Sequence, residues 1–200
     1  MEKLMILNGS PRAPRSNSKR YAALFETNYP GEIAYFEIKK ENHLHLRDEM
    51  EHAAKLLVVF PLYADSLPVT LLNFLKTLEQ NSPQNKPTVS VLVNCGFLEP
   101  RQNDVAVEML RLFCTANGYP FGAVLKIGSG EAILDTPFAG LLRRKIKRFA
   151  AAVARSCSAT FAVTMPLPKR LFLRASTAYW TKYGEKNGVS KEEMQRMRIE

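Results

Sequence analysis

Short apolar runs alternate with longer amphipathic stretches along most of the chain. Each run is rich in aliphatic and β-branched side chains and is bounded by polar or turn-forming residues, which is typical of buried strands. Five strands are predicted, at residues 3–7, 32–38, 55–60, 88–93 and 123–127.

The stretches between these runs carry the spacing of amphipathic helices. Pro68 suits the first turn of one helix, where Leu71, Leu75 and Leu78 form an apolar face. Two further helices are predicted at residues 19–26 and 46–54. A fourth, at residues 104–116, ends before Asn117-Gly118. A fifth begins at Thr136-Pro137, and its apolar face consists of Leu142, Ile146, Phe149 and Val153. Regular alternation of strand and helix requires parallel strands with helical crossovers. The predicted fold over residues 1–160 is therefore α/β, a doubly wound five-stranded parallel sheet with helices on both faces.

The last part of the chain has a different pattern. Met165-Pro166-Leu167-Pro168 breaks the alternation, and a helix is predicted from there through Tyr183. Residues 190–193, Ser-Lys-Glu-Glu, match a capping box for one more short helix. We expect residues 165–200 to form a helical C-terminal extension, with Trp180, the single tryptophan, packing it on the domain or on a partner subunit.

The net charge of +9 is concentrated in the last third of the chain. Residues 138–200 hold 14 Lys and Arg against 4 Asp and Glu, whereas residues 1–137 hold 14 against 15. The basic, amphipathic segments 141–148 and 168–174 are best interpreted as helices with solvated charged faces; contact with an anionic membrane or an acidic partner is the weaker alternative. No nucleic-acid recognition motif is present, so nucleic acid is not an expected partner.

Composition excludes several other classes of protein. No segment has the roughly 20 apolar residues of a membrane span, and the N-terminus enters a strand without signal-peptide architecture, so the default prediction is cytoplasmic. Cys95, Cys114 and Cys157 form no Cys-x-x-Cys pair, and the three histidines have no ligand spacing to cysteines or carboxylates. Neither a disulfide framework nor a metal site is expected.

Ligands in a doubly wound sheet bind beyond the carboxyl ends of the strands, where the strand order reverses. The loop after the first predicted strand, residues 8–18, places short polar side chains just before a helix, where free N–H groups favour a phosphate. The candidates are Ser10, Ser16, Asn17 and Ser18, with charge from Arg12 or Arg15. The glycine-rich dinucleotide and nucleoside-triphosphate motifs are absent. Taken alone, the segment is equally compatible with an ordinary capped loop.

The next two loops offer partners for a planar ring. After the third strand come Pro61, Leu62, Tyr63, Ala64 and Asp65, in which Tyr63 supplies a flat aromatic surface and the backbone supplies polar groups; a half-buried surface tyrosine is the alternative. After the fourth strand come Asn94, Cys95, Gly96 and Phe97, in which Gly96 permits close approach of the main chain. Cys95 has no neighbouring base in sequence, so we expect backbone contact and nominate no catalytic side chain.

The three loops together resemble a known family. Ile-Leu-Asn-Gly-Ser-Pro-Arg … Ser-Asn-Ser, Phe-Pro-Leu-Tyr-Ala-Asp-Ser-Leu-Pro and Asn-Cys-Gly-Phe-Leu-Glu are similar, in this order, to motifs of the NAD(P)H-dependent FMN reductases and flavodoxin-like oxidoreductases. The resemblance covers about residues 1–155 and implies a flavodoxin-like sheet of strand order 2-1-3-4-5. It also implies that the first loop holds the FMN phosphate and that the second and third loops contact the flavin.

The resemblance implies an FMN-dependent oxidoreductase that takes hydride from NAD(P)H and passes electrons to a quinone or another small acceptor. It also implies a homodimer, since a neighbouring subunit often completes the flavin site in that family. Two alternatives stay open. A flavodoxin-type electron carrier fits less well, because such carriers are typically acidic and this chain has a pI of about 9.6. A flavin-free binding or regulatory protein is compatible with the same fold.

Overall fold

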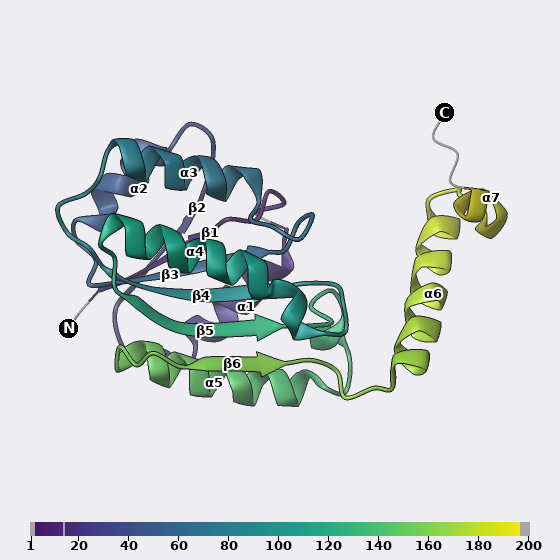
Figure 1. The fold of residues 1–200 in the computed structure, drawn as a ribbon. Coiled ribbons are helices and arrows are strands. Elements are labelled where there is room, and N and C mark those ends of the chain that lie inside the picture. The colour runs from purple at the N-terminus through teal and green to yellow at the C-terminus, as the bar shows by residue number, and fades with distance from the viewer. Residues whose placement is uncertain (1–2, 14, 197–200) are drawn as a thin grey trace. The chain divides into compact units, whose positions relative to one another are not determined.

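The computed structural model describes residues 3–13 and 15–196, which divide into two compact units. The first unit, here called the sheet unit, ends at Met165, and the second, the helical unit, begins at Pro166. Figure 1 shows the strands and flanking helices of the sheet unit and the two helices of the helical unit. Each unit is described by itself.

The sheet unit contains one parallel sheet of six strands in the order β2-β1-β3-β4-β5-β6. The strands are β1 (Leu4–Asn8), β2 (Ile33–Glu37), β3 (Lys55–Pro61), β4 (Thr88–Asn94), β5 (Phe121–Ile127) and β6 (Thr160–Val163). The chain leaves β1 toward β2 on one side and returns to β3 on the other, so the strand order reverses between β1 and β3. The predicted α/β parallel fold is confirmed.

The prediction of five strands is wrong, because β6 extends the sheet beyond β5. It pairs in parallel from Val124↔Thr160 to Ile127↔Val163. The strand is four residues long, lies at the edge of the sheet, and is buried fully only at Val163. A short, half-exposed edge strand lacks the continuous apolar run that identifies the central strands of a parallel sheet.

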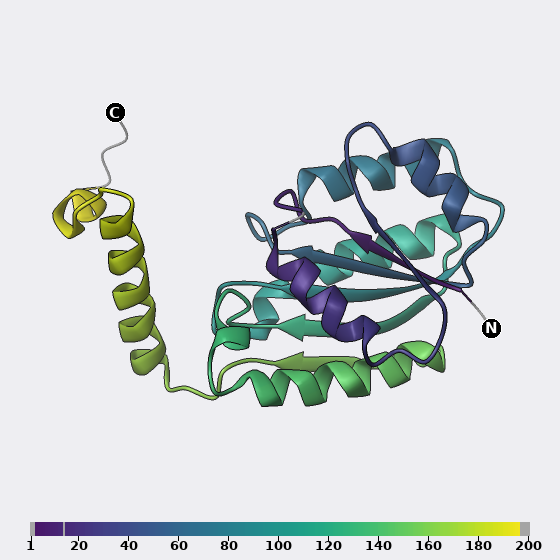
Figure 2. The ribbon, with the colours of Figure 1, turned by 180° about the vertical axis from the view of Figure 1, so that it is seen from behind.

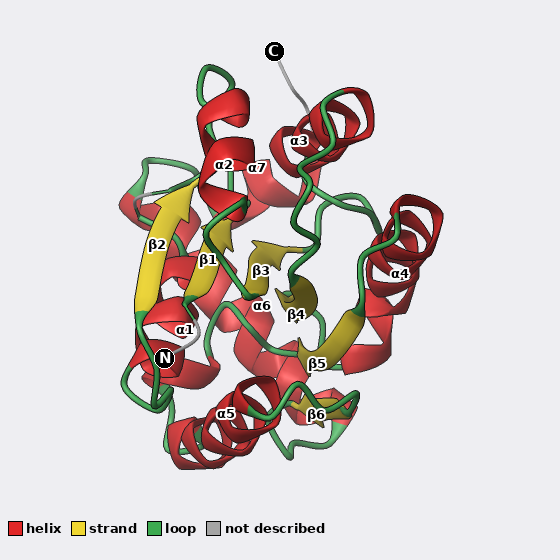
Figure 3. Cartoon of the chain, turned by 90° about the vertical axis from the view of Figure 1, so that its left-hand side faces the viewer, coloured by secondary structure: helices red, strands yellow, loops and turns green. Residues whose placement is uncertain are grey.

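Helices cover both faces of the sheet. Figures 2 and 3 show α1 and α5 on one face and α2, α3 and α4 on the other. The helices are α1 (Asn17–Glu26), α2 (His43–Met50), α3 (Val69–Gln80), α4 (Asp104–Asn117) and α5 (Ala139–Ala154), with single turns at Pro100–Asn103 and Ile133–Asp135. Gly118 ends α4 in the left-handed conformation, at φ 73°, which confirms the predicted stop.

Both faces of the sheet are buried, and side chains alternate between them along each strand. In β3, Leu56, Val58 and Phe60 belong to the apolar cluster under α2, α3 and α4. On the opposite face, Phe25 of α1 meets Phe149 of α5 edge to face, with ring centroids 5.7 Å apart. Burial on both faces explains why the central strands are apolar without alternation.

Cys114 lies in the apolar cluster under α2, α3 and α4. Its thiol should make the free energy of unfolding depend on pH in the alkaline range. Burial raises the pKa of the Cys114 thiol to about 12, whereas an unfolded chain ionises cysteine at about 8.5. Between these values the unfolded state binds fewer protons than the folded state, so the free energy of unfolding falls as pH rises, by at most about 1.4 kcal/mol per pH unit. Urea unfolding from about pH 8.5 to 12 should show a shallower decline for Cys114→Ala than for the parent protein.

Cys157 provides the matched control, because it is a free cysteine at the surface. Cys157→Ala should leave the alkaline slope unchanged. Equal slopes for the parent and for Cys114→Ala would contradict the assignment to Cys114.

The helical unit consists of α6 (Lys169–Lys186) and α7 (Lys191–Arg196). Gly184 is the buried residue of α6, and a Cβ there would meet the sulfur of Met194 in α7. The predicted capping box is confirmed, since Ser190 N donates to Glu193 Oε2 at 2.7 Å and Glu193 N donates to Ser190 Oγ at 3.2 Å. The packing of Trp180 on the domain or on a partner stays a prediction. Of the helices in the described residues, none combines the length and apolar character needed to cross a bilayer.

Candidate functional site

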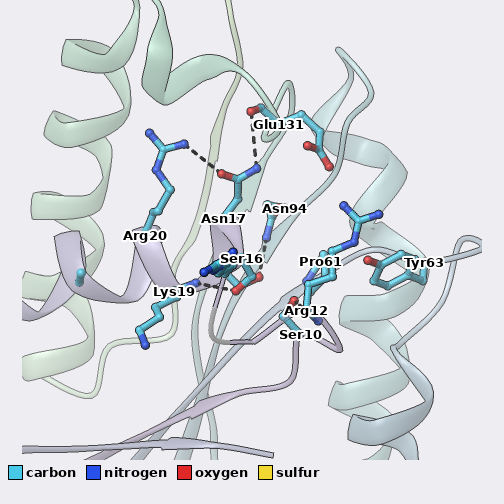
Figure 4. Close-up of a pocket in the computed structure, with 13 residues that line it drawn as sticks. Ser10, Arg12, Ser16, Asn17, Lys19, Arg20, Pro61, Tyr63, Asn94 and Glu131 are labelled. Carbon is cyan, nitrogen blue, oxygen red and sulfur yellow. Dashed lines mark hydrogen bonds between the residues drawn. The ribbon is translucent and has the colours of Figure 1, made fainter. Parts of the chain in front are cut away.

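A pocket of about 560 Å³ opens at the carboxyl ends of β1, β3 and β4. Its walls come from the loop after β1, the first turns of α1, the ends of β3 and β4, and the loop after β5 (Figure 4). The lining residues are Ser10, Arg12, Arg15, Ser16, Asn17, Ser18, Lys19, Arg20, Ala23, Pro61, Tyr63, Asn94 and Glu131.

The loop after β1 is held in place by the buried side chain of Asn8. Its Oδ1 accepts a hydrogen bond from Ser10 N at 2.9 Å, and its Nδ2 donates to Tyr35 Oη at 2.9 Å and to Ser16 Oγ at 3.4 Å. Ser10 Oγ in turn accepts from Arg12 N at 3.3 Å. Asn8 therefore links both ends of the loop, which fixes the backbone at the pocket floor before any ligand binds.

The first turn of α1 supplies unpaired donors. Ser16 caps the helix, its Oγ accepting from Lys19 N at 3.2 Å. The N–H groups of Asn17 and Ser18 precede the first intrahelical bonds and have no acceptor among the described residues. A helix start of this kind carries partial positive charge and favours an anion.

Positive charge at the pocket is only partly compensated. Arg20 forms an ion pair with Asp135, in which Arg20 Nη1 donates to Asp135 Oδ2 at 2.9 Å and Arg20 Nη2 donates to Asp135 Oδ1. These hydrogen bonds lower the pKa of the Asp135 carboxyl and raise the pKa of Arg20. Lys19 Nζ lies 3.5 Å from Glu37 Oε1. The exposed side chains of Arg12 and Arg15 form no ion pair within the described residues. These two arginines are the cations available to an anionic ligand.

The loop after β3 makes a tight turn at the pocket rim. Tyr63 and Ser66 exchange backbone hydrogen bonds of 3.2 and 2.9 Å, and between them Ala64 and Asp65 both adopt left-handed conformations, with φ 46° and 55°. Two successive positive φ values define a primed turn. Residues other than glycine adopt this backbone conformation at a cost in conformational free energy. The turn presents the Tyr63 ring, which is 40% exposed, to the pocket.

The loop after β4 is anchored more deeply. Asn94 is buried, and its Nδ2 donates to Ser18 Oγ at 3.2 Å and to Phe60 O at 3.1 Å, so it joins β4 to α1 and β3. Cys95 Sγ accepts from Asn103 Nδ2 at 3.4 Å, and burial raises the pKa of the Cys95 thiol. Phe97 is 53% exposed. A protonated, buried thiol is not a nucleophile.

The loop after β5 contributes a further wall, to which sequence reasoning assigned no ligand contact, although Glu131 and Asp135 were expected in or near the cleft loops. Gly130 N donates to Cys95 O at 2.7 Å, and a Cβ on Gly130 would lie 2.9 Å from the Asn94 Cβ, so only glycine permits this approach. The Tyr21 hydroxyl donates to Gly130 O, and Asn17 Nδ2 donates to Glu131 O at 3.5 Å. Figure 4 shows Asn17 between Arg20 and the Glu131 backbone. The Gly-Ser-Gly sequence after the fifth predicted strand was the available signal.

The structure gathers eight of the fourteen predicted site residues around the pocket. These are Ser10, Arg12, Ser16, Asn17, Ser18, Pro61, Tyr63 and Asn94. The other six, in the adjoining loops but outside the lining, are Leu62, Ala64, Asp65, Cys95, Gly96 and Phe97. Arg15, the predicted alternative to Arg12, lines the pocket as well, whereas Lys19, Arg20, Ala23 and Glu131 were not predicted. Within residues 3–13 and 15–196, no cluster of three or more His, Cys, Asp or Glu has the geometry of a metal site.

Comparison with known proteins identifies the fold. Neither a protein-family profile nor a curated protein sequence matches the chain. Solved structures do match. An NAD(P)H:quinone oxidoreductase from Methanothermobacter marburgensis is 13% identical with a TM-score of 0.59, over 74% of this chain and 94% of that one. A flavodoxin from Streptococcus pneumonia is 14% identical with a TM-score of 0.56, over 76% and 98%.

A third similar structure is an FMN-dependent NADH-azoreductase from Bacillus anthracis in complex with FMN. It is 14% identical with a TM-score of 0.56, over 77% of this chain and 100% of that one. At these identities the likeness establishes the fold. The resemblance drawn from the three loops is thus confirmed at that level: the chain has the flavodoxin-like fold of FMN reductases, quinone reductases and azoreductases.

Proposed function

We propose that this protein binds FMN in the pocket and passes electrons from NAD(P)H through the flavin to a quinone or another small acceptor. The observation that carries the proposal is the composition of the pocket. N–H groups without an acceptor, hydroxyls and two arginines without an ion pair, as far as the described residues go, line one part of the pocket, and an exposed tyrosine ring stands on the neighbouring loop.

The donor end fits a phosphate monoester. Asn17 N, Ser18 N and the Ser10 hydroxyl would hold the phosphate oxygens, and Arg12 and Arg15 would neutralise the charge. Asn8 orders the loop beforehand, so little conformational entropy is lost when the anion binds. A pocket of about 560 Å³ is also within the usual range of about 300–1,000 Å³ for cofactor sites.

The rim fits a planar heterocycle. Tyr63 would stack on the ring, and the N–H groups of Ala64 and Asp65, which have no backbone acceptor within the described residues, would meet its polar edge. Phe97 follows β4, the strand next to β3, and is a second exposed aromatic at the same edge of the sheet.

Bound FMN supplies hydride and electron transfer itself. The chain's own task is to bind the phosphate, orient the ring against Tyr63 and limit the access of water. Because Cys95 is buried and protonated, no side-chain nucleophile is assigned. The acceptor, the nicotinamide donor and a homodimeric assembly are parts of this proposal.

An electron carrier is the competing function, since flavodoxin shares this fold to a similar degree. Mixing the FMN-loaded protein with NADH or NADPH and a soluble quinone separates the two. Rapid, catalytic oxidation of the nicotinamide supports the enzyme. Reduction by chemical reductants alone, with no turnover of either nicotinamide, supports the carrier.

FMN binding should depend on the Tyr63 ring. Tyr63→Ala should weaken FMN binding by about 1 kcal/mol, or roughly fivefold, because stacking with an aromatic ring contributes about 0.5–1.5 kcal/mol. The measurement is a titration of FMN fluorescence with the cofactor-free protein.

Tyr179→Ala in α6 is the control, since Tyr179 is another exposed tyrosine, 53% exposed, outside the pocket lining. It should bind FMN like the parent protein. If the parent protein neither quenches FMN fluorescence nor gains heat stability from FMN, the proposed function is wrong. If it binds FMN and Tyr63→Ala matches it, the ring has been placed against the wrong side chain.

A further inference from the structure

The helix α6 separates aromatic from basic side chains around its circumference. Residues at spacings of three and four share a helix face. One face carries Phe172, Leu173, Tyr179, Trp180 and Tyr183, with Lys169 at its N-terminal end. The other carries Arg170, Arg174, Lys182 and Lys186, together with Leu171 and Glu185. Within the helical unit this aromatic face is left uncovered, with 46% exposure at Trp180 and 53% at Tyr179 and Tyr183. A helix whose apolar face remains exposed is a candidate for binding at a surface.

The aromatic side chains form one cluster. The Tyr179 and Trp180 ring centroids lie 5.2 Å apart, and the Trp180 and Tyr183 centroids 5.8 Å apart. Tyrosine and tryptophan combine an apolar body with a polar tip, and they concentrate where hydrocarbon meets water, at the headgroup level of a bilayer.

The neighbouring helix α7 extends this surface. A groove of about 280 Å³ runs between the two helices and includes Leu173, Trp180 and Met194. The capping box at Ser190 and the Met194 contact with Gly184 fix the position of α7 on α6. The apolar surface is therefore preformed in the helical unit.

The charge of α6 favours an anionic partner. The sequence of α6 holds five basic residues and one acidic residue, so two copies of the helix would repel each other. An anionic lipid surface attracts the same helix, each basic residue near it raising the partition roughly fivefold. Basic residues on one face with Trp, Phe and Leu on the other are typical of helices that lie in the membrane interface without crossing it.

We propose that α6 binds anionic lipid bilayers, lying in the interface with the aromatic face of Phe172, Leu173, Tyr179, Trp180 and Tyr183 among the acyl chains and its basic face among the headgroups. The sequence offered two segments for a membrane contact, residues 141–148 and 168–174. This proposal assigns the contact to residues 168–174 alone. In α5, Leu142, Ile146 and Phe149 are buried against the sheet, so that helix has no apolar face to insert.

Trp180 allows a direct test, because it is the single tryptophan of the chain. The full 200-residue protein is mixed with vesicles of phosphatidylcholine alone or of phosphatidylcholine with phosphatidylglycerol, and binding is measured by co-sedimentation and by tryptophan emission. We expect binding to the anionic vesicles, a blue shift of the Trp180 emission, and release by added salt.

Two pairs of substitutions separate α6 from general positive charge. Arg174→Gln with Lys182→Gln should reduce the partition roughly 30-fold, since two basic contacts are lost. Arg144→Gln with Lys147→Gln removes the same charge from exposed positions of α5 and should leave binding within about twofold of the parent protein. Leu173→Glu should reduce binding without changing the far-ultraviolet circular dichroism, which checks that α6 remains helical.

Several results would overturn the proposal. These are failure to bind phosphatidylglycerol vesicles, equal losses in the α5 and α6 pairs, or binding with unchanged Trp180 emission. A dimer in sedimentation velocity that Leu173→Glu dissociates, with no vesicle binding, would assign the face to a second copy. Vesicle binding needs no flavin, so the result of the vesicle experiment does not depend on whether the proposed FMN function is correct.

Discussion

Replacing Arg12 and Arg15 together by alanine is expected to weaken FMN binding about 100-fold, or about 3 kcal/mol, because a hydrogen bond to a charged group contributes about 1.5–3 kcal/mol. Both side chains lie at the pocket and have no ion-pair partner within the described residues. Their removal therefore breaks no ion pair among the described residues, and the folded protein should unfold at the same urea concentration as its parent. Fluorescence titration of FMN measures the affinity.

Riboflavin identifies which part of the ligand the arginines contact, because it lacks the phosphate. The parent protein should bind FMN much more tightly than riboflavin, and the double variant should bind the two almost equally. Arg148→Ala in α5 with Arg155→Ala at the C-terminal cap of that helix removes the same charge from exposed positions outside the pocket lining, and should leave FMN affinity unchanged. A parallel loss of riboflavin and FMN affinity in the Arg12 and Arg15 variant would show that the phosphate lies elsewhere.

The central strands were predictable because burial on both faces leaves a continuous apolar signal. Predicted residues 55–60 and 88–93 became β3 (Lys55–Pro61) and β4 (Thr88–Asn94). The edge strand β6 gave no such signal, since two of its four residues are exposed. Its place in the sheet depends on pairing with β5, a contact across the length of α5 that local sequence does not encode.

The end of the pocket that carries the loop after β1 was predictable for a similar reason, since its hydrogen-bond donors lie in one stretch of sequence just before a helix. The opposite wall was not. Asn17 meets Glu131, and Arg20 meets Asp135, across more than a hundred residues, and no periodicity connects such positions. Sequence also predicted Asn94 as a ligand contact; it lines the pocket, and the structure adds that its Nδ2 donates to Ser18 Oγ and to Phe60 O.

The packing of α1 against α5 holds α1 beside the site. A substitution at this contact should therefore have the second large effect, on the free energy of unfolding. Phe149→Ala is expected to lower the free energy of unfolding by about 3–5 kcal/mol, because removing a fully buried phenylalanine leaves a cavity in addition to the lost burial. The ring meets Phe25 at 5.7 Å and Phe161 at 6.2 Å, so one substitution weakens the contacts of α5 with both α1 and β6. Urea unfolding measures the change.

Phe97→Ala is the matched control, since it removes the same side chain from a position that is 53% exposed, and it should change the free energy of unfolding by no more than about 0.5 kcal/mol. Because α1 carries donors that we propose to hold the phosphate, Phe149→Ala should also weaken FMN binding, and excess FMN should restore part of the lost stability by mass action. A loss below about 1 kcal/mol, in the range of a surface substitution, would show that α5 is not packed on α1 through Phe149. Stability lost as expected, with no rescue by FMN, would show instead that the packing is correct and that the cofactor does not bind at α1.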